Sequence, residues 1–189
     1  MEKKYFFFDI DGTLTDRSTG KIVPSAREAL DRLEANGHFV AIATGRAHYK
    51  ARKFTGANGF KNMVCCGGNG CVINNELVEN IPLDKEGCLQ IIHQSEELGY
   101  GWCVALDDTK DVYMTDDKFL RQVGKRKEPT RYIIDDMLDI DSVDAIYKIY
   151  VAIPKEEEEK LTKKELIGHL RFEPEYLMFQ PDNKRGGIV

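Results

Sequence analysis

The sequence has no long apolar run and no excess of basic residues, and each absence removes a class of function. No stretch of about 18 consecutive apolar residues occurs, so no transmembrane helix is expected. The 189 residues include 27 Lys and Arg against 32 Asp and Glu, which gives a net charge of −5. That balance lacks the basic footprint of a protein that binds nucleic acid or an anionic membrane surface. We therefore expect neither nucleic acid nor a membrane among the partners.

Cysteine and histidine are also too irregular for a disulfide framework or a zinc site. The five cysteines are odd in number, include the neighbours Cys65 and Cys66, and form no Cys-x-x-Cys pair. The four histidines show no ligand spacing. The charged first residues, Met1 to Lys4, do not have the layout of a signal peptide. These features predict reduced thiols in a cytoplasmic protein.

An early pair of carboxylates is the most informative feature present. The apolar run Tyr5–Phe8 leads into Asp9 and Asp11, and Gly12 then allows a sharp turn. Residues two apart on a strand point the same way, so both carboxylates can enter one pocket. Such a pair is costly unless a cation or proton lies between them, and Mg²⁺ prefers oxygen ligands. One carboxylate could attack an electrophile while the other moves a proton.

The first third of the chain alternates between strand and helix patterns, which predicts an α/β fold with a doubly wound parallel sheet. Ser25 and Glu28 have the spacing of a capping box at the start of the first helix. Ligands in such folds bind beyond the carboxyl ends of the strands, where Asp9 and Thr44 lie. The expected strands are 5–8, 38–43 and 62–66, and the expected helices are 25–36 and 46–54.

From about Pro82 the pattern changes to mixed α and β, which predicts a second unit inserted into the first. A helix is expected over residues 155–170, because four successive glutamates suit a helix N-terminus and face lysines at helical spacing. The other expected elements are a hairpin at 72–78, a helix at 84–98, and strands at 102–106, 112–115, 145–153, 171–173 and 176–180.

Two further segments follow expected strands and carry polar groups. Thr44 stands at a strand end before Gly45, where a hydroxyl can bind a phosphate oxygen with help from helix N–H groups. It could equally be a plain helix cap, and Arg46 could be an exposed helix residue. Asn69, in the turn Gly67-Gly68-Asn69-Gly70, could face a substrate or form a bare turn.

The segment Asp9-Ile10-Asp11-Gly12-Thr13-Leu14 resembles the first motif of the haloacid dehalogenase (HAD) superfamily of phosphatases. The resemblance implies that Asp9 is the nucleophile that forms an aspartyl-phosphate. It implies that Asp11 is the general acid and base, and that Gly12 lies on the substrate side. It also implies Mg²⁺ as the cofactor, held by Asp9 and by the backbone carbonyl of Asp11.

Thr44-Gly45-Arg46 resembles the second motif of the family, in the Thr-Gly-Arg form found in the Cof-like phosphatases. The resemblance implies that Thr44 binds the phosphoryl group and that Gly45 and Arg46 contact the substrate. Asn69 matches the Asn-Gly turn that follows the third strand in the same group, which implies a substrate contact there.

The third and fourth motifs depart from the family pattern. Lys184 resembles the lysine that neutralises the nucleophile and phosphoryl group, but the chain reads Lys184-Arg185-Gly186 where the family has Lys-Gly, so Arg185 is a second candidate. The acidic fourth motif, which completes the metal site, is expected after Lys184, and the sequence ends at Val189. A piece of a longer phosphatase is the favoured explanation. The alternatives are a genuine short protein that binds a ligand without turnover, and a chain whose sheet is completed by a partner chain. The missing strands would leave an unpaired sheet edge, through which the chain could self-associate.

The resemblance as a whole implies a Rossmann-like HAD core at residues 1–82 and 180–189 with an inserted α+β cap at 83–179. It implies Mg²⁺-dependent hydrolysis of a small phosphomonoester, such as a sugar phosphate or similar metabolite, through an aspartyl-phosphate. A phosphomutase and a phosphate-binding module without turnover are alternatives. A signalling receiver domain is a third, disfavoured by the Gly12-Thr13-Leu14 tail and the inserted unit.

Overall fold

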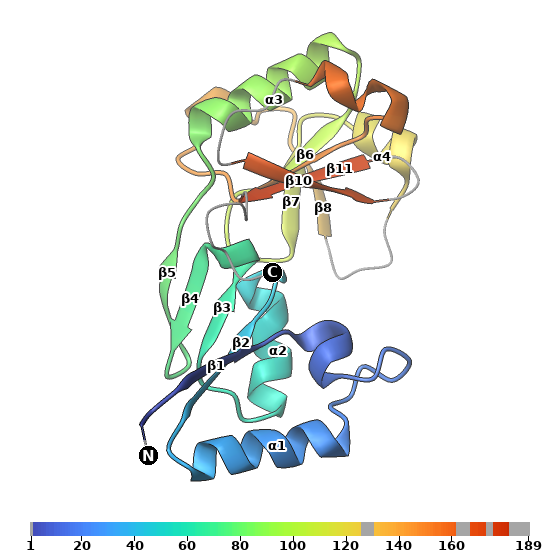
Figure 1. Ribbon diagram of the computed structural model, residues 1–189. Helices are drawn as coiled ribbons and strands as arrows, with labels where there is room; N and C mark the ends of the chain where they lie inside the picture. Colours follow the sequence, from blue (N-terminus) through green and yellow to red (C-terminus); the bar gives the residue numbers. More distant parts are fainter. Residues whose placement is uncertain (1, 126–130, 162–166, 173–175, 182–189) are drawn as a thin grey trace. The chain divides into compact units, whose positions relative to one another are not determined.

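The computed structural model describes residues 2–125, 131–161, 167–172 and 176–181, and these form two compact units (Figure 1). Unit 1 contains the described residues up to Asn80, and unit 2 contains those from Ile81 onward. Each unit has its own sheet and its own apolar core.

Unit 1 is built on a five-stranded sheet in the order β1-β2-β3-β4-β5. The first three strands are parallel, which confirms the predicted α/β class, and the last two add an antiparallel hairpin. Asn74 and Asn75 turn the hairpin at positive φ, a conformation that asparagine tolerates. The strands are β1 (Tyr5–Phe8), β2 (Phe39–Ala43), β3 (Met63–Cys65), β4 (Gly70–Ile73) and β5 (Glu76–Asn80).

The two helices of unit 1 are α1 (Pro24–Ala35) and α2 (His48–Ala57), and their buried residues join the core around β2. The predicted capping box at Ser25 is wrong, because the helix already starts at Pro24 and Val23 is its N-cap. Proline is preorganised for the first helical position, so Ser25 falls inside the first turn. The second helix starts at His48, two residues later than predicted.

Unit 2 has a six-stranded sheet in the order β10-β11-β9-β6-β7-β8, in which only β7 and β8 pair in parallel among the described strands. Trp102 and Val104 pack with buried residues of α3, and Cys103 packs on the other face with Phe119 of α4. The elements are α3 (Lys85–Glu97), β6 (Trp102–Ala105), β7 (Asp111–Met114), α4 (Lys118–Val123), β8 (Arg131–Ile134), β9 (Lys148–Val151), β10 (Ile167–Phe172) and β11 (Tyr176–Pro181).

The helix predicted over residues 155–170 is wrong. A short 3-10 helix occupies Lys155–Lys160, and Ile167–Phe172 is instead strand β10, which pairs antiparallel with β11. Charge pairs at helical spacing contribute only about 0.2–0.5 kcal/mol each. They do not outweigh a register of six residue pairs between two strands. The strand predicted at 145–153 is confined to Lys148–Val151.

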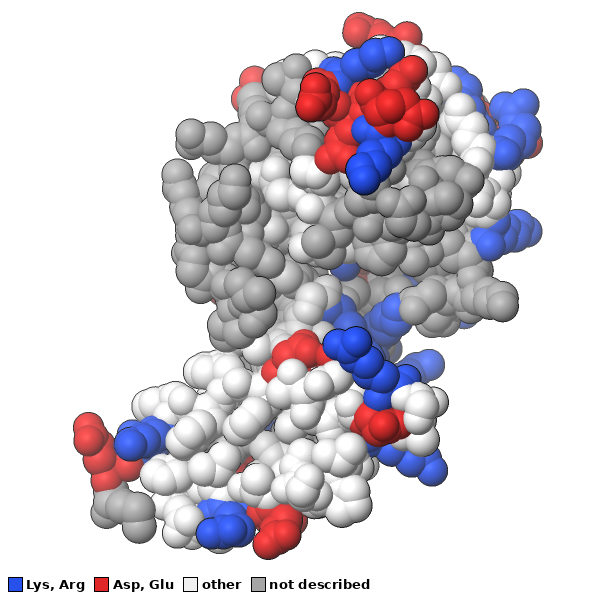
Figure 2. All heavy atoms as spheres, turned by 45° about the vertical axis from the view of Figure 1, so that its right-hand side comes forward, with Lys and Arg blue, Asp and Glu red and all other residues white. Residues whose placement is uncertain are grey.

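Charged side chains of both signs lie on the surface. On the face shown in Figure 2, Lys and Arg side chains are interspersed with Asp and Glu. Within the part of the chain that the structure describes, no helix has both the length and the apolar content needed to cross a bilayer.

Candidate active site

A tight loop after β1 presents the two predicted catalytic carboxylates. Asp9 is half-buried directly after the strand, and the loop Ile10–Leu14 is anchored by the buried side chains of its first and last residues. Gly12 turns the loop at a φ of +83°, a conformation that disfavours residues with a Cβ. The Thr15 hydroxyl donates a 2.8 Å hydrogen bond to the carbonyl of Ile10, which closes the loop.

An ion pair joins this loop to the end of β2. The Arg46 guanidinium donates from Nε to Oδ2 of Asp11 at 3.0 Å and from Nη2 to Oδ1 at 2.5 Å. The two bonds form a bidentate fork, which fixes orientation as well as charge. The side chains are 30% and 62% exposed for Arg46 and Asp11, so the pair is open to solvent.

Thr44 is fixed beside the same ion pair. Thr44 is only 8% exposed, and its hydroxyl accepts a 3.2 Å hydrogen bond from the backbone N–H of Arg46. Its own backbone N–H donates to the carbonyl of Val64 on β3 at 2.9 Å. The hydroxyl therefore lies at the edge of the sheet, next to Arg46.

The third strand is tied to the site through Cys66. The backbone N–H of Cys66 donates a 2.8 Å hydrogen bond to the carbonyl of Arg46. Asn69, half-buried, follows the one-turn 3-10 helix η2 (Cys66–Gly68) at this edge. The parallel strands β1, β2 and β3 thus bring Asp9, Asp11, Thr44 and Arg46 together, with the Asn69 turn following the third.

One basic residue at this edge did not emerge from the sequence. The Arg17 guanidinium lies over Gly12, so close that a Cβ added to Gly12 would be 2.7 Å from the Nε of Arg17. Arg17 sits in a turn held by Asp16, whose carboxylate accepts hydrogen bonds from Ser18 and Thr19. The Ser18 hydroxyl bond lowers the pKa of Asp16 below its ordinary value, so the carboxylate stays ionised in that turn. In the sequence, the only indication of this second cation was a basic residue six positions after Asp11.

The donor chemistry of the loop fits Mg²⁺, the ion that the family resemblance implies. Asp9 offers carboxylate oxygens and Asp11 a backbone carbonyl, and hard cations prefer such oxygen ligands. The carboxylate of Asp11 is held by Arg46. Among the described residues there is no group of three or more His, Cys, Asp or Glu side chains placed to hold a metal. The pair therefore suits a hydrated ion bound together with a substrate phosphate, a common arrangement for Mg²⁺. Lys184 and Arg185 lie outside the described residues.

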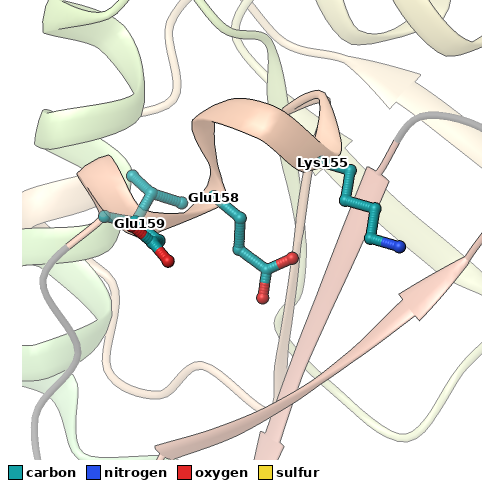
Figure 3. Close-up of a pocket in the computed structure, with 4 residues that line it drawn as sticks. Lys155, Glu158 and Glu159 are labelled. Carbon is teal, nitrogen blue, oxygen red and sulfur yellow. The ribbon is translucent and has the colours of Figure 1, made fainter.

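A separate pocket of about 400 Å³ opens in unit 2 (Figure 3). Its described lining consists of Lys155, Glu158, Glu159 and Leu161, and includes none of the predicted site residues. Glu158 also forms a 2.5 Å ion pair with the imidazole of His169. Because the pocket is lined by none of the residues gathered after β1 and β2, the candidate active site is the loop after β1 and not this pocket.

Comparison with known proteins points to one family. The family model of the haloacid dehalogenase-like hydrolases matches residues 6–180. The chain is 28% identical to the Bacillus subtilis protein named "Putative phosphatase YkrA" over 116 residues, which cover 61% of this chain and 45% of that protein. It is 35% identical to a phosphoglycolate phosphatase of Nitrosopumilus maritimus over 72 residues, 38% of this chain and 31% of that protein. The chain thus spans less than half the length of these two curated relatives.

Solved structures share the fold. A hypothetical protein from Geobacillus kaustophilus superposes with a TM-score of 0.72 at 22% identity, over 95% of this chain and 70% of that one. The sugar phosphatase BT4131, of HAD subclass IIB, superposes with a TM-score of 0.66 at 20% identity, over 98% of this chain and 71% of that one. The family match over most of the sequence, with the parallel sheet and its fold relatives, shows that this chain belongs to the haloacid dehalogenase-like hydrolases.

Proposed function

We propose that this chain carries the nucleophile and the phosphate-binding groups of a phosphomonoesterase. The observation that carries the proposal is the bidentate Arg46–Asp11 pair, which gathers carboxylates, a guanidinium and the Thr44 hydroxyl at one sheet edge. The family match and the phosphatases among the relatives support this chemistry. The proposed substrate is a small phosphorylated metabolite such as a sugar phosphate, the substrate class in the name of one fold relative.

In the proposed reaction Asp9 is the nucleophile. A carboxylate oxygen of Asp9 attacks phosphorus, and the bond from phosphorus to the ester oxygen breaks. Asp11 donates a proton to that oxygen, so the leaving group departs as an alcohol. Asp11 then takes a proton from water, which attacks the aspartyl-phosphate and releases inorganic phosphate. Mg²⁺, when bound by Asp9 and Asp11, would neutralise phosphoryl charge.

Arg46 is proposed to exchange partners when the substrate arrives. An exposed ion pair contributes roughly 0–1 kcal/mol, so breaking the pair with Asp11 costs little. A phosphoryl dianion offers the guanidinium more negative charge in the same forked geometry. Asp11 is then released to hold the proton that the leaving group needs. Arg17, whose guanidinium lies over Gly12, is a second cation beside this loop.

The test is phosphate release from p-nitrophenyl phosphate with Mg²⁺, measured on the product of the complete reading frame that contains this chain. Asp9→Asn is expected to abolish turnover, because an amide cannot act as the nucleophile, while the circular dichroism spectrum stays unchanged. Asp31→Asn, an exposed change on α1, is the matched control and should retain full activity. Turnover by Asp9→Asn at a rate close to that of the wild type would refute the assignment.

A further inference from the structure

The adjacent cysteines after β3 form a geometric feature that phosphoryl transfer does not use. Cys65 is fully buried and Cys66 half-buried, and the Cys66 thiol donates to the Cys65 sulfur across 3.9 Å. Neither is in a disulfide. Cys66 has a φ of +56°, a left-handed conformation that costs free energy in any residue with a Cβ.

Gly70 on the neighbouring strand makes room for both sulfurs. A Cβ built on Gly70 would lie 2.5 Å from the Cys65 sulfur and 3.2 Å from the Cys66 sulfur. Both thiols therefore lie over one bare backbone position, on one side of the β3–β4 pair. Cys71 follows Gly70 on β4 and pairs with Val64, so it points to the opposite face.

The sulfur separation suits a bridging atom better than a direct sulfur–sulfur bond. Two bonds of about 2.3 Å from one centre to the two sulfurs hold the sulfurs about 3.3–3.8 Å apart, for bond angles from about 90° at a pyramidal centre to about 110° at a tetrahedral one. A disulfide would have to bring them to about 2.05 Å. Neighbouring Cα atoms are about 3.8 Å apart, below the usual disulfide range of about 4.4–6.8 Å. A closed disulfide here would be strained and easily reduced.

We propose that Cys65 and Cys66 form a dithiol site for a single thiophilic centre that needs only two protein sulfurs, of the class of monosubstituted trivalent arsenicals. Zinc fits less well, because a structural zinc site needs four ligands and the described residues offer no group of three. In the reaction two arsenic–oxygen bonds break and two arsenic–sulfur bonds form. Each thiol proton leaves with a hydroxide as water, and no atom changes oxidation state.

Entry begins at Cys66, the more accessible thiol, and Cys65 then closes the ring. The second step is intramolecular, which strengthens binding by about 10²–10⁴-fold over a single thiol. The N–H of Cys66 also bonds to the Arg46 carbonyl, so an adduct would act on the loop that holds Arg46. The site is independent of the proposed phosphatase function, and its test uses no activity.

The test is binding of phenylarsine oxide to the native protein, followed by intact mass and by competition. One adduct per chain is expected, stable to excess monothiol and removed by a vicinal dithiol. Cys66→Ser and, separately, Cys65→Ser should weaken binding by about 10²–10⁴-fold, whereas Cys71→Ser, the matched control, should bind like the wild type.

Because Cys65 is buried, the folding of each variant is checked by circular dichroism, and Cys66→Ser decides the outcome if Cys65→Ser does not fold. Gly70→Ala is a second test variant. Its added methyl group is expected to displace both sulfurs and so weaken the adduct, while both thiols remain. The absence of a monothiol-resistant adduct on the native protein, or its persistence in Cys66→Ser, would overturn the proposal.

Discussion

Arg46 connects three strand ends through three different groups. Its guanidinium holds Asp11, its backbone N–H binds the Thr44 hydroxyl, and its carbonyl accepts from Cys66. A lysine in its place would keep the charge but could not form the fork with a carboxylate or a phosphate. If the proposed function holds, Arg46 is the residue whose replacement tests substrate binding most sharply.

Replacing Arg46 should therefore weaken the productive complex with a phosphomonoester. Arg46→Ala is expected to lower kcat/KM by about 10–100-fold, the equivalent of about 1.5–3 kcal/mol for hydrogen bonds to a charged group. Arg46→Lys should recover only part of that loss, mainly in KM. Steady-state kinetics on p-nitrophenyl phosphate measure both, with the exposed Arg52→Ala on α2 as the control. An unchanged kcat/KM in Arg46→Ala would contradict the proposed exchange of partners.

At the scale of elements, the predicted strands at the site are confirmed and one long helix is not. Apolar runs that end in polar residues mark β1 and β2. Such a run is typical of a strand covered on both faces, and β2 is buried along most of its length. The residues of β1 are only half-buried or exposed, which its apolar run does not reveal. The segment after Lys155 was predicted to be helical only because its glutamates and lysines are three or four residues apart. The strands expected at 171–173 and 176–180 do pair as a hairpin, but β10 continues back to Ile167, which pairs with Pro181 at the far end of the hairpin. The helical spacing of the charges before it gave no sign of that extension. The Cys66–Arg46 hydrogen bond is non-local in the same way.

In unit 2, an ion pair between Asp111 and Arg131 joins the parallel strands β7 and β8. Arg131 Nε donates to Asp111 Oδ1 at 2.8 Å, and the Asp111 side chain is only 12% exposed. The hydrogen bonds from Arg131 lower the pKa of Asp111 below its ordinary value. A carboxyl whose folded pKa is depressed stabilises the fold above its unfolded pKa, and that stability is lost as pH falls through the folded value.

The pair should therefore make unit 2 sensitive to acid below about pH 4, the ordinary range for an aspartate. Asp111→Asn is expected to be less stable than the wild type at neutral pH and to lose less stability on acidification. Denaturant unfolding at both pH values measures the difference, with the exposed Asp136→Asn as control. Equal acid sensitivity in Asp111→Asn and the wild type would show that the pair does not couple to folding.

At the scale of the whole molecule, β1 is an edge of its sheet in the described part of the chain, and it carries exposed aromatic residues. Tyr5 is 64% and Phe7 43% exposed, and both rings lie against Phe39 with centroid distances of 5.3 and 6.2 Å. An exposed apolar edge is a template for pairing with another chain. We propose that the 189-residue chain self-associates through β1.

Light scattering across a range of concentrations tests this association. The 189-residue chain is expected to form a concentration-dependent dimer, and Phe7→Lys should return it to a monomer, because a charged residue blunts an edge. Val78→Lys on β5 is the control, since that side chain is 55% exposed on another strand of the same sheet. A monomer at every concentration, or a dimer unaffected by Phe7→Lys, would exclude the β1 interface.

We propose above all that Asp9 carries the phosphoryl group during turnover. The most direct measurement is to quench the Mg²⁺-dependent reaction of the complete reading-frame product in acid, reduce the acyl phosphate with borohydride, and locate the resulting homoserine by peptide mass. We expect homoserine at position 9, and none there in Asp9→Asn. Homoserine at position 11 instead would reverse the roles of Asp9 and Asp11, and turnover with no trapped residue at either position would contradict the covalent mechanism.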